Sequence, residues 1–219
     1  MDISQIVYRI AVGAPVFLLA IVLHEWAHAY VALRFGDTTA RDAGRLTLNP
    51  AVHLDLVGTI IFPLLGAAMG WAMFGWAKPV PINMATVIRR GGYNAAMQVD
   101  LAGIVYNFTL AVIASIVVVA MAQPTTADSL VYLFTYIFMF QLLVINVVLG
   151  VFNLLPVPQF DGAHFLMHLS LKYKINAVAE FFYKNERYGI IVVLVILMTP
   201  LKDYLLFLPV QTILGLLIS

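Results

Sequence analysis

The sequence predicts an all-α membrane protein, a polytopic helical bundle of about four to six transmembrane segments with short membrane-associated β strands. Two observations indicate this class. First, 63% of the 219 residues are hydrophobic and only 11% are charged, whereas a soluble domain usually carries about 25% charged residues. Second, apolar runs near the length that a helix needs to cross a bilayer recur along the chain. These runs must be helical, because hydrocarbon offers the backbone no other hydrogen-bond partner.

The predicted elements follow these apolar runs, and we expect residues 1–219 to form a single domain. Four segments cover residues 6–33, 56–76, 95–122 and 130–155. A fifth region, 188–218, is interrupted at Pro200 and is either one kinked span or two short ones. We expect a motif-bearing core at about residues 6–165 and C-terminal helices at about 188–218.

The basic residues predict how the segments are oriented. Arginine and lysine occur in the connecting stretches 34–55, 77–94 and 156–187, but not in 123–129. The positive-inside tendency places the first three in the cytoplasm and the last one outside. Segment 56–76 must then enter and leave on one side as a re-entrant hairpin. A single crossing is the alternative on charge alone.

Composition also limits the chemistry. The chain has no cysteine, which excludes disulfides and thiolate metal sites, so any metal must be held by His, Asp or Glu. The net charge of +1 and the scattered basic residues give no indication of a nucleic-acid partner. Two stretches, 44–48 and 78–82, are expected to be extended, because Pro79 and Pro81 exclude a helix and suit a strand edge.

The run His24-Glu25-Trp26-Ala27-His28 lies within the first apolar segment. Positions i and i+4 share one helix face, so both imidazoles can bind one metal ion. Glu25 can take a proton from a water on that metal. Ionisable residues in an apolar helix are costly and tend to be functional. The alternative is two buried histidines that hydrogen-bond to neighbouring helices.

A catalytic zinc usually has three protein ligands and a water, so two histidines leave the site one ligand short. Asp161 is the leading candidate, because Pro156 and Pro158 unwind the end of the fourth segment and Gly162 permits a tight turn. The alternative is that Asp161 only caps the next helix.

These motifs occur with others in an order that resembles the site-2 protease family of intramembrane zinc metalloproteases, of the small bacterial and archaeal type without a PDZ domain. The resemblance covers residues about 20–165. Besides the His-Glu-x-x-His helix, it rests on Gly-Arg-Leu-Thr-Leu-Asn-Pro at 44–50 with His53 and Asp55, Gly-Trp-Ala-Lys-Pro-Val-Pro at 75–81, Ala-Gly-x-x-x-Asn at 102–107, and Phe-Asn-Leu-Leu-Pro at 152–156 before Asp161-Gly162.

The resemblance implies one zinc ion per chain, held by His24, His28 and Asp161, with Glu25 as general base. It implies hydrolysis of peptide bonds in membrane-spanning proteins or peptides by a zinc-activated water. In the family, the position of Asn107 is thought to hold the substrate backbone or the developing oxyanion. An interhelical hydrogen bond is the alternative role.

Other polar residues have open roles. Asn153 and His53 are expected to help bind substrate, although His53 can also orient a metal ligand or bond locally in its loop. His164 and His168 are spaced i, i+4 and are either a second metal pair, an alternative ligand, or two polar residues of an interfacial helix.

The sequence departs from the family pattern at four positions. Ile104 replaces a proline, Asp100 is an unexpected charge, Gln159 stands where proline is common, and His164 stands near a usual arginine. None of these changes removes a predicted ligand or the base. They therefore bear on substrate preference rather than on chemistry.

Both histidines and Asp161 lie near basic loops, so the site is expected within the cell membrane, close to its cytoplasmic face. Stretches 44–48 and 78–82 can hold an unwound substrate by strand addition. A membrane metal-ion transporter is the main alternative, and it predicts ligands spread along a path. A catalytically inactive membrane scaffold is the other, and it has no need for Glu25. The sequence does not define an oligomeric state.

Overall fold

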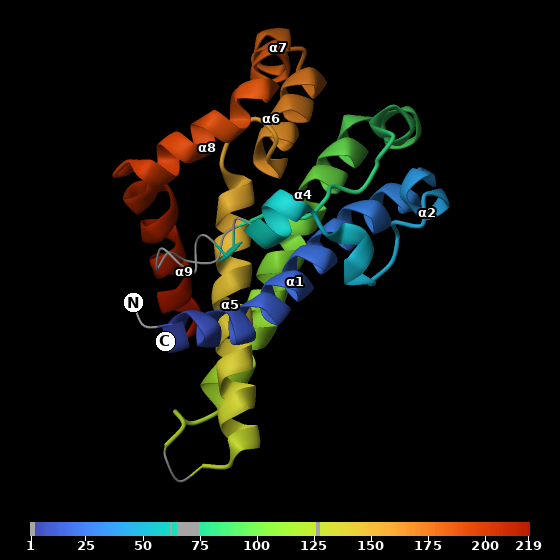
Figure 1. Ribbon diagram of the computed structural model, residues 1–219. Helices are drawn as coiled ribbons and strands as arrows, with labels where there is room; N and C mark the ends of the chain where they lie inside the picture. The colour runs from blue at the N-terminus through green and yellow to red at the C-terminus, as the bar shows by residue number, and fades with distance from the viewer. Residues whose placement is uncertain (1–2, 62, 65–74, 126–127) are drawn as a thin grey trace.

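The computed structural model describes residues 3–61, 63–64, 75–125 and 128–219, which form helices joined by loops (Figure 1). Among the described residues, three helices are long and apolar enough to cross a membrane, and one bent pair of helices adds a fourth span if the pair is counted as one. The long helices are α1 (Ile3–Arg34), α4 (Met84–Ala120) and α5 (Leu130–Leu154). The helical class is confirmed, with a span count at the lower end of the predicted range.

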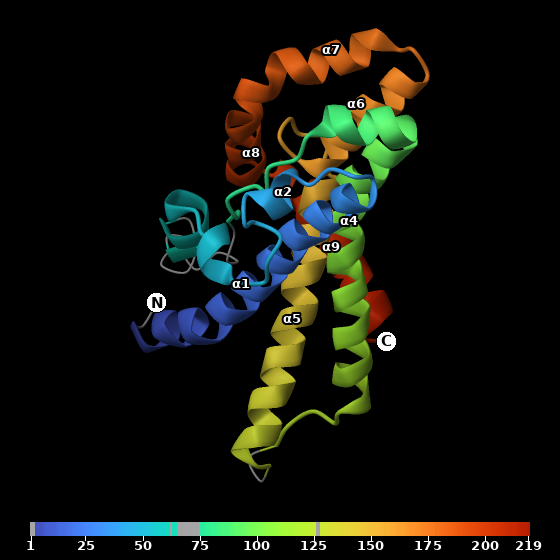
Figure 2. The same cartoon turned by 90° about the vertical axis from the view of Figure 1, so that its right-hand side faces the viewer.

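Helices α4 and α5 run antiparallel, and α1 crosses them obliquely (Figures 1 and 2). Their contacts bury most of the core, which includes the fully enclosed side chains of Phe17, Leu143 and Val147. The loop between α4 and α5 lies at one end of the bundle, while α6 (Asp161–Lys172) and α7 (Asn176–Asn185) lie at the other end. The C-terminal part of α1, which bears His24 and His28, and the start of α6, which bears Asp161, therefore lie in the same part of the molecule.

The C-terminal region is bent, as the interruption at Pro200 predicts. Helix α8 (Gly189–Met198) ends just before this proline, and the chain resumes in η4 (Asp203–Phe207) and α9 (Leu208–Leu217). The two halves meet at 90°. Side chains from both halves join the core cluster around α5, so this region packs against the bundle.

The predicted β strands are absent from the part of the chain that the structure describes, so this part of the fold prediction is wrong. Residues 78–81 offer no free backbone donor to a strand partner. Pro79 and Pro81 have no N–H, the Lys78 N–H donates to the His53 carbonyl at 2.9 Å, and the Val80 N–H donates to a side chain. The two stretches are joined instead by Arg45, whose guanidinium donates to the Lys78 carbonyl at 2.8 Å.

Both ends of the predicted segment 56–76 lie side by side. It begins as η2 (Leu56–Ile61), a π-helical turn. The Trp76 N–H donates to the Gly58 carbonyl at 3.1 Å, and the Thr59 hydroxyl donates to the Trp76 carbonyl at 2.8 Å. The expected turn of the hairpin falls at residues 62 and 65–74, outside the described residues. The short elements α2 (Thr39–Asp42) and η1 (Pro50–His53) precede it.

Candidate metal centre

Helix α1 carries His24, Glu25 and His28 in its C-terminal third. The two histidines are one turn apart, so their rings pack edge to face with centroids 4.7 Å apart. Both are buried, at 8% and 7% exposure, whereas Glu25 is only partly buried. The helix therefore presents two imidazoles to the interior and keeps the carboxylate at the edge of the same site.

Asp161 reaches the histidines from the start of α6, after the short loop that ends α5. The loop turns sharply, with Gln159 at a φ of 84°. Gly162 permits the close return, because a Cβ there would lie 2.4 Å from the Leu154 carbonyl oxygen. Gly189 of α8 packs equally closely, since its Cβ would lie 2.2 Å from the Pro158 carbonyl oxygen. Backbone contacts that only glycine allows thus place the carboxylate.

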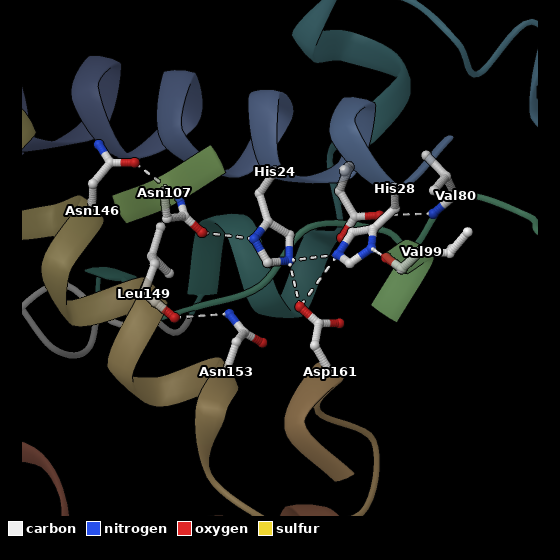
Figure 3. A network of polar contacts seen from close by, with 10 residues as sticks. His24, His28, Val80, Val99, Asn107, Asn146, Leu149, Asn153 and Asp161 are labelled. Atoms are coloured by element: carbon white, nitrogen blue, oxygen red, sulfur yellow. Dashed lines mark hydrogen bonds and ion pairs between the residues drawn. The ribbon is translucent and has the colours of Figure 1, made fainter. Parts of the chain in front are cut away.

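The three predicted ligand side chains meet at one point (Figure 3). The His24 and His28 Nε2 atoms are 3.1 Å apart, and each lies 3.2 Å from Asp161 Oδ2. Ligand atoms about 2.0–2.1 Å from a tetrahedral zinc ion are about 3.3 Å from one another. The spacing of the three atoms therefore fits one zinc coordination shell.

The protonation of both imidazoles follows from their partners. His28 Nδ1 lies 2.7 Å from the Val99 carbonyl oxygen, which can only accept, so this nitrogen carries the proton. The Leu142 carbonyl likewise orients the Asn146 amide, which accepts from the Asn107 amide nitrogen at 2.8 Å. The Asn107 oxygen then faces His24 Nδ1 at 2.7 Å and accepts from it. In the neutral form, imidazoles held this way carry their proton on Nδ1 and offer both Nε2 lone pairs.

Three lone pairs thus converge, from two Nε2 atoms and from Asp161 Oδ2, which is buried and has no hydrogen-bond donor. Such a group requires a positive charge at its centre, from a metal ion or a proton. Burial raises the pKa of Asp161, but a proton on either histidine would lower it below its usual range. The donor set of two nitrogens and one carboxylate is one that zinc accepts in catalytic sites.

Helix α4 shapes the wall behind the imidazoles. A Cβ at Gly103 would lie 2.4 Å from His24 Cε1 and from His28 Nε2. Val99, Gly103 and Asn107 are spaced at i, i+4 and i+8, so one face of α4 makes room for both rings and orients both. The Ala-Gly-x-x-x-Asn motif is therefore part of the metal centre.

Glu25 has a backbone partner from the proline-rich stretch. Its Oε2 accepts a hydrogen bond from the Val80 N–H at 2.8 Å. Pro79 and Pro81 on either side keep this strand-like stretch extended, and its one donor between them turns toward α1. The Pro-Val-Pro motif thus orients the carboxylate.

The tentative substrate residues lie in different surroundings. Asn107 is completely buried, and its amide is engaged on both sides. His53 is 1% exposed and bonds through Nε2 to the Thr47 carbonyl at 2.9 Å, so it bonds locally in its loop and lies outside the metal group. Asn153 is half-buried on α5, and its amide nitrogen donates to the Leu149 carbonyl at 3.0 Å.

Sequence reasoning missed one side-chain partner of this site, Asn146. Asn146 completes the chain of amides to His24, and a polar side chain in so apolar a helix was the available signal. His168 does not approach the metal group but bonds to Asp100, and His164 lies half-buried on the same helix. The histidine pair of α6 therefore does not form a second metal site.

Comparisons with known proteins find relatives that are named as zinc metalloproteases. The model of Peptidase family M50 matches residues 119–198. "Putative zinc metalloprotease YwhC" of Bacillus subtilis is 38% identical over 202 residues, which cover 87% of this chain and 81% of that protein. "Putative zinc metalloprotease Rip2" of Mycolicibacterium smegmatis is 32% identical over 84% of this chain and 65% of its own length. No solved structure matches the chain significantly.

Proposed function

The chain belongs to peptidase family M50, the site-2 protease family, and from that premise we propose that His24, His28 and Asp161 hold its zinc ion while Glu25 is the general base. The chain is an intramembrane zinc metalloprotease. The observation that carries the residue assignment is the convergence of two imidazole nitrogens and one carboxylate oxygen at mutual distances of 3.1 Å and 3.2 Å.

The chemistry follows from these positions. Zinc bound by the three residues supplies a Lewis acid that lowers the pKa of a coordinated water to about 7. Glu25 takes the proton from the attacking water and returns it to the leaving amine. The Val80 N–H occupies Glu25 Oε2, so Oε1 is the oxygen that exchanges the proton.

We assign Asn107 to the orientation of His24 rather than to the oxyanion. Its oxygen accepts from His24 Nδ1, and its nitrogen donates to Asn146. Both functions of the amide are used, and the side chain is completely buried. A partner that fixes the outer nitrogen of a histidine ligand raises its basicity and holds the ring toward the metal.

The substrate is a peptide segment within the lipid bilayer. We propose that it unwinds locally at the site, because a regular helix engages its own carbonyls. Strand addition along 78–82 is not favoured, since Pro79 and Pro81 have no N–H and the Lys78 and Val80 N–H groups are already used. We propose instead that the half-buried Asn153, which lies beside Asp161 in Figure 3, accepts a hydrogen bond from the substrate backbone. The burial of His53 supports a structural role for that residue.

We place the site inside the cell membrane, near its cytoplasmic face. His28 precedes Arg34 by six residues, which corresponds to about 9 Å along α1. Basic residues follow α1 and lie along α6 and α7, whereas the loop between α4 and α5 at the opposite end has none. This asymmetry supports a cytoplasmic position for the ligand-bearing ends.

A metal-ion transporter is not favoured by the arrangement of ligands. Among the described residues, His24, His28 and Asp161 form the group of His, Asp and Glu that could hold a metal. A transport path requires such residues at several depths.

We also propose that residues 1–219 act as one domain, because the C-terminal helices pack on α5.

The assignment is tested by separating metal binding from catalysis. Glu25→Gln should keep about one zinc ion per chain and lose cleavage of a membrane-spanning substrate by about 10²–10⁴-fold. His24→Ala/His28→Ala should lose both zinc and cleavage, and Glu180→Gln on the exposed face of α7 is the control. Full zinc content in the double histidine variant, or undiminished cleavage by Glu25→Gln, would overturn the proposed roles.

A further inference from the structure

A buried histidine–aspartate hydrogen bond lies near the metal centre and takes no part in the chemistry above. His168 Nδ1 of α6 lies 2.7 Å from Asp100 Oδ2 of α4, and the two side chains are only 6% and 3% exposed. Neither residue belongs to the group that can hold a metal. The pair therefore connects two helices by their side chains at a point that water scarcely reaches.

Stability alone does not account for such a pair. Burial of a carboxylate with its histidine partner costs about as much free energy as their contact returns, and apolar residues of similar volume often stabilise a fold equally well or better. Removal of one partner is costly, because the other charge is left buried and unpaired. A buried pair thus defines the relative position of the two elements that carry it.

The two helices joined here are the ones that assemble the metal ligands. Asp100 directly follows Val99, whose carbonyl oxygen orients His28. His168 lies seven residues after Asp161 on α6, which is about 10 Å along the helix axis. The first turn of α6 is held separately, where Gly162 packs on the Leu154 carbonyl. The pair adds a second attachment of α6, by side chains to α4, about two turns after Asp161.

We propose that Asp100 and His168 are positioning residues that hold α6 against α4 and thereby keep Asp161 at the distance that zinc requires from His24 and His28. This inference rests on the proposed ligand set. It gives the unexpected charge at position 100 a function, and it assigns His168 to the support of the third ligand.

The decisive variant replaces the pair with apolar side chains. When both proteins are metal-free, Asp100→Leu/His168→Leu should have unchanged or higher thermal stability than the wild type, because no buried polar group is left unpaired. Its zinc affinity, measured by competition with a chelator, should fall by about 10–100-fold, the usual effect of losing a residue that supports a metal ligand. The absorption spectrum of the Co²⁺-substituted protein should also change, since it reports coordination geometry. His164→Leu on the same helix is the matched control and should behave like the wild type.

A conservative variant supplies the rescue. The amide nitrogen of an asparagine occupies nearly the same place as Nδ1 and can still donate to Asp100. His168→Asn should therefore keep the zinc affinity and cobalt spectrum of the wild type, unlike the double leucine variant. Unchanged zinc affinity and spectrum in the double leucine variant would overturn the proposal. Asp161→Ala separates the two hypotheses. If it retains zinc, the ligand assignment itself fails. If it loses zinc while the double leucine variant does not, only the positioning role fails.

Discussion

At the scale of single residues, Gly103 controls whether two imidazoles fit beside α4. A methyl group there would stand 2.4 Å from atoms of both His24 and His28, well inside van der Waals contact. We predict that Gly103→Ala displaces the rings and that the purified protein loses most of its zinc. Gly215→Ala is the control, because a Cβ there meets nothing within 4 Å. Metal analysis measures the outcome, and a full zinc complement in Gly103→Ala would contradict the packing described.

Asn107 tests two roles that make different predictions. If it orients His24, Asn107→Ala should weaken zinc binding by about 10–100-fold, and Asn146→Ala should do so to a lesser degree. If it holds an oxyanion, Asn107→Ala should keep the zinc affinity and lower only kcat, by about 10²–10³-fold. Asn153→Ala is the matched control for zinc affinity, because its amide nitrogen bonds within its own helix. Zinc titration together with kcat at saturating zinc decides between the roles.

At the scale of the element, segment 56–76 is expected to enter and leave on one side. The hydrogen bonds between Trp76 and residues 58–59 tie its two ends together. Both flanking stretches should then lie on the cytoplasmic side. The chain is free of cysteine, so single cysteines at the exposed positions Ala43, Arg89 and Gln123 report topology directly.

We predict that an impermeant thiol reagent labels Gln123→Cys in intact cells. It should label Ala43→Cys and Arg89→Cys only after the membrane is opened. Labelling of Ala43→Cys and Arg89→Cys from opposite sides would show that the segment crosses. That result would also disagree with the adjacent ends seen in the structure.

At the scale of the whole molecule, the proposed zinc ion joins α1 to α6, which are separated by more than a hundred residues. A ligand that binds only the folded state stabilises it, by about 4 kcal/mol when its free concentration is 1,000 times Kd. We predict that chelation lowers the Tm of the wild type and of Glu25→Gln. His24→Ala/His28→Ala should have a low Tm that chelation does not change. An equal Tm of the wild type with and without chelator would argue against a metal that joins these helices.

The elements and the ligand types were readable from local patterns. Apolar length predicted α5 at 130–155, and the structure has it at Leu130–Leu154. Proline placement predicted the break near residue 200, where the chain bends by 90°. The same reasoning failed for the strands, because the prolines that exclude a helix also remove the donors that a strand needs. No local rule shows that the Val80 N–H belongs to a glutamate 55 positions earlier.

By itself, the sequence determined that this protein lies in a membrane and which side chains it offers as metal ligands. Hydrocarbon requires its long apolar runs to be helical, and the i, i+4 spacing requires His24 and His28 to share a face. Only the tertiary structure decided which groups meet them. Asn107, Asn146 and Asp100 are isolated polar residues in their helices. Their positions in the sequence do not show which residues they bond to. Their partners come from how α4 packs between α1, α5 and α6, since a hydrogen bond depends on distances in space that local periodicity does not specify.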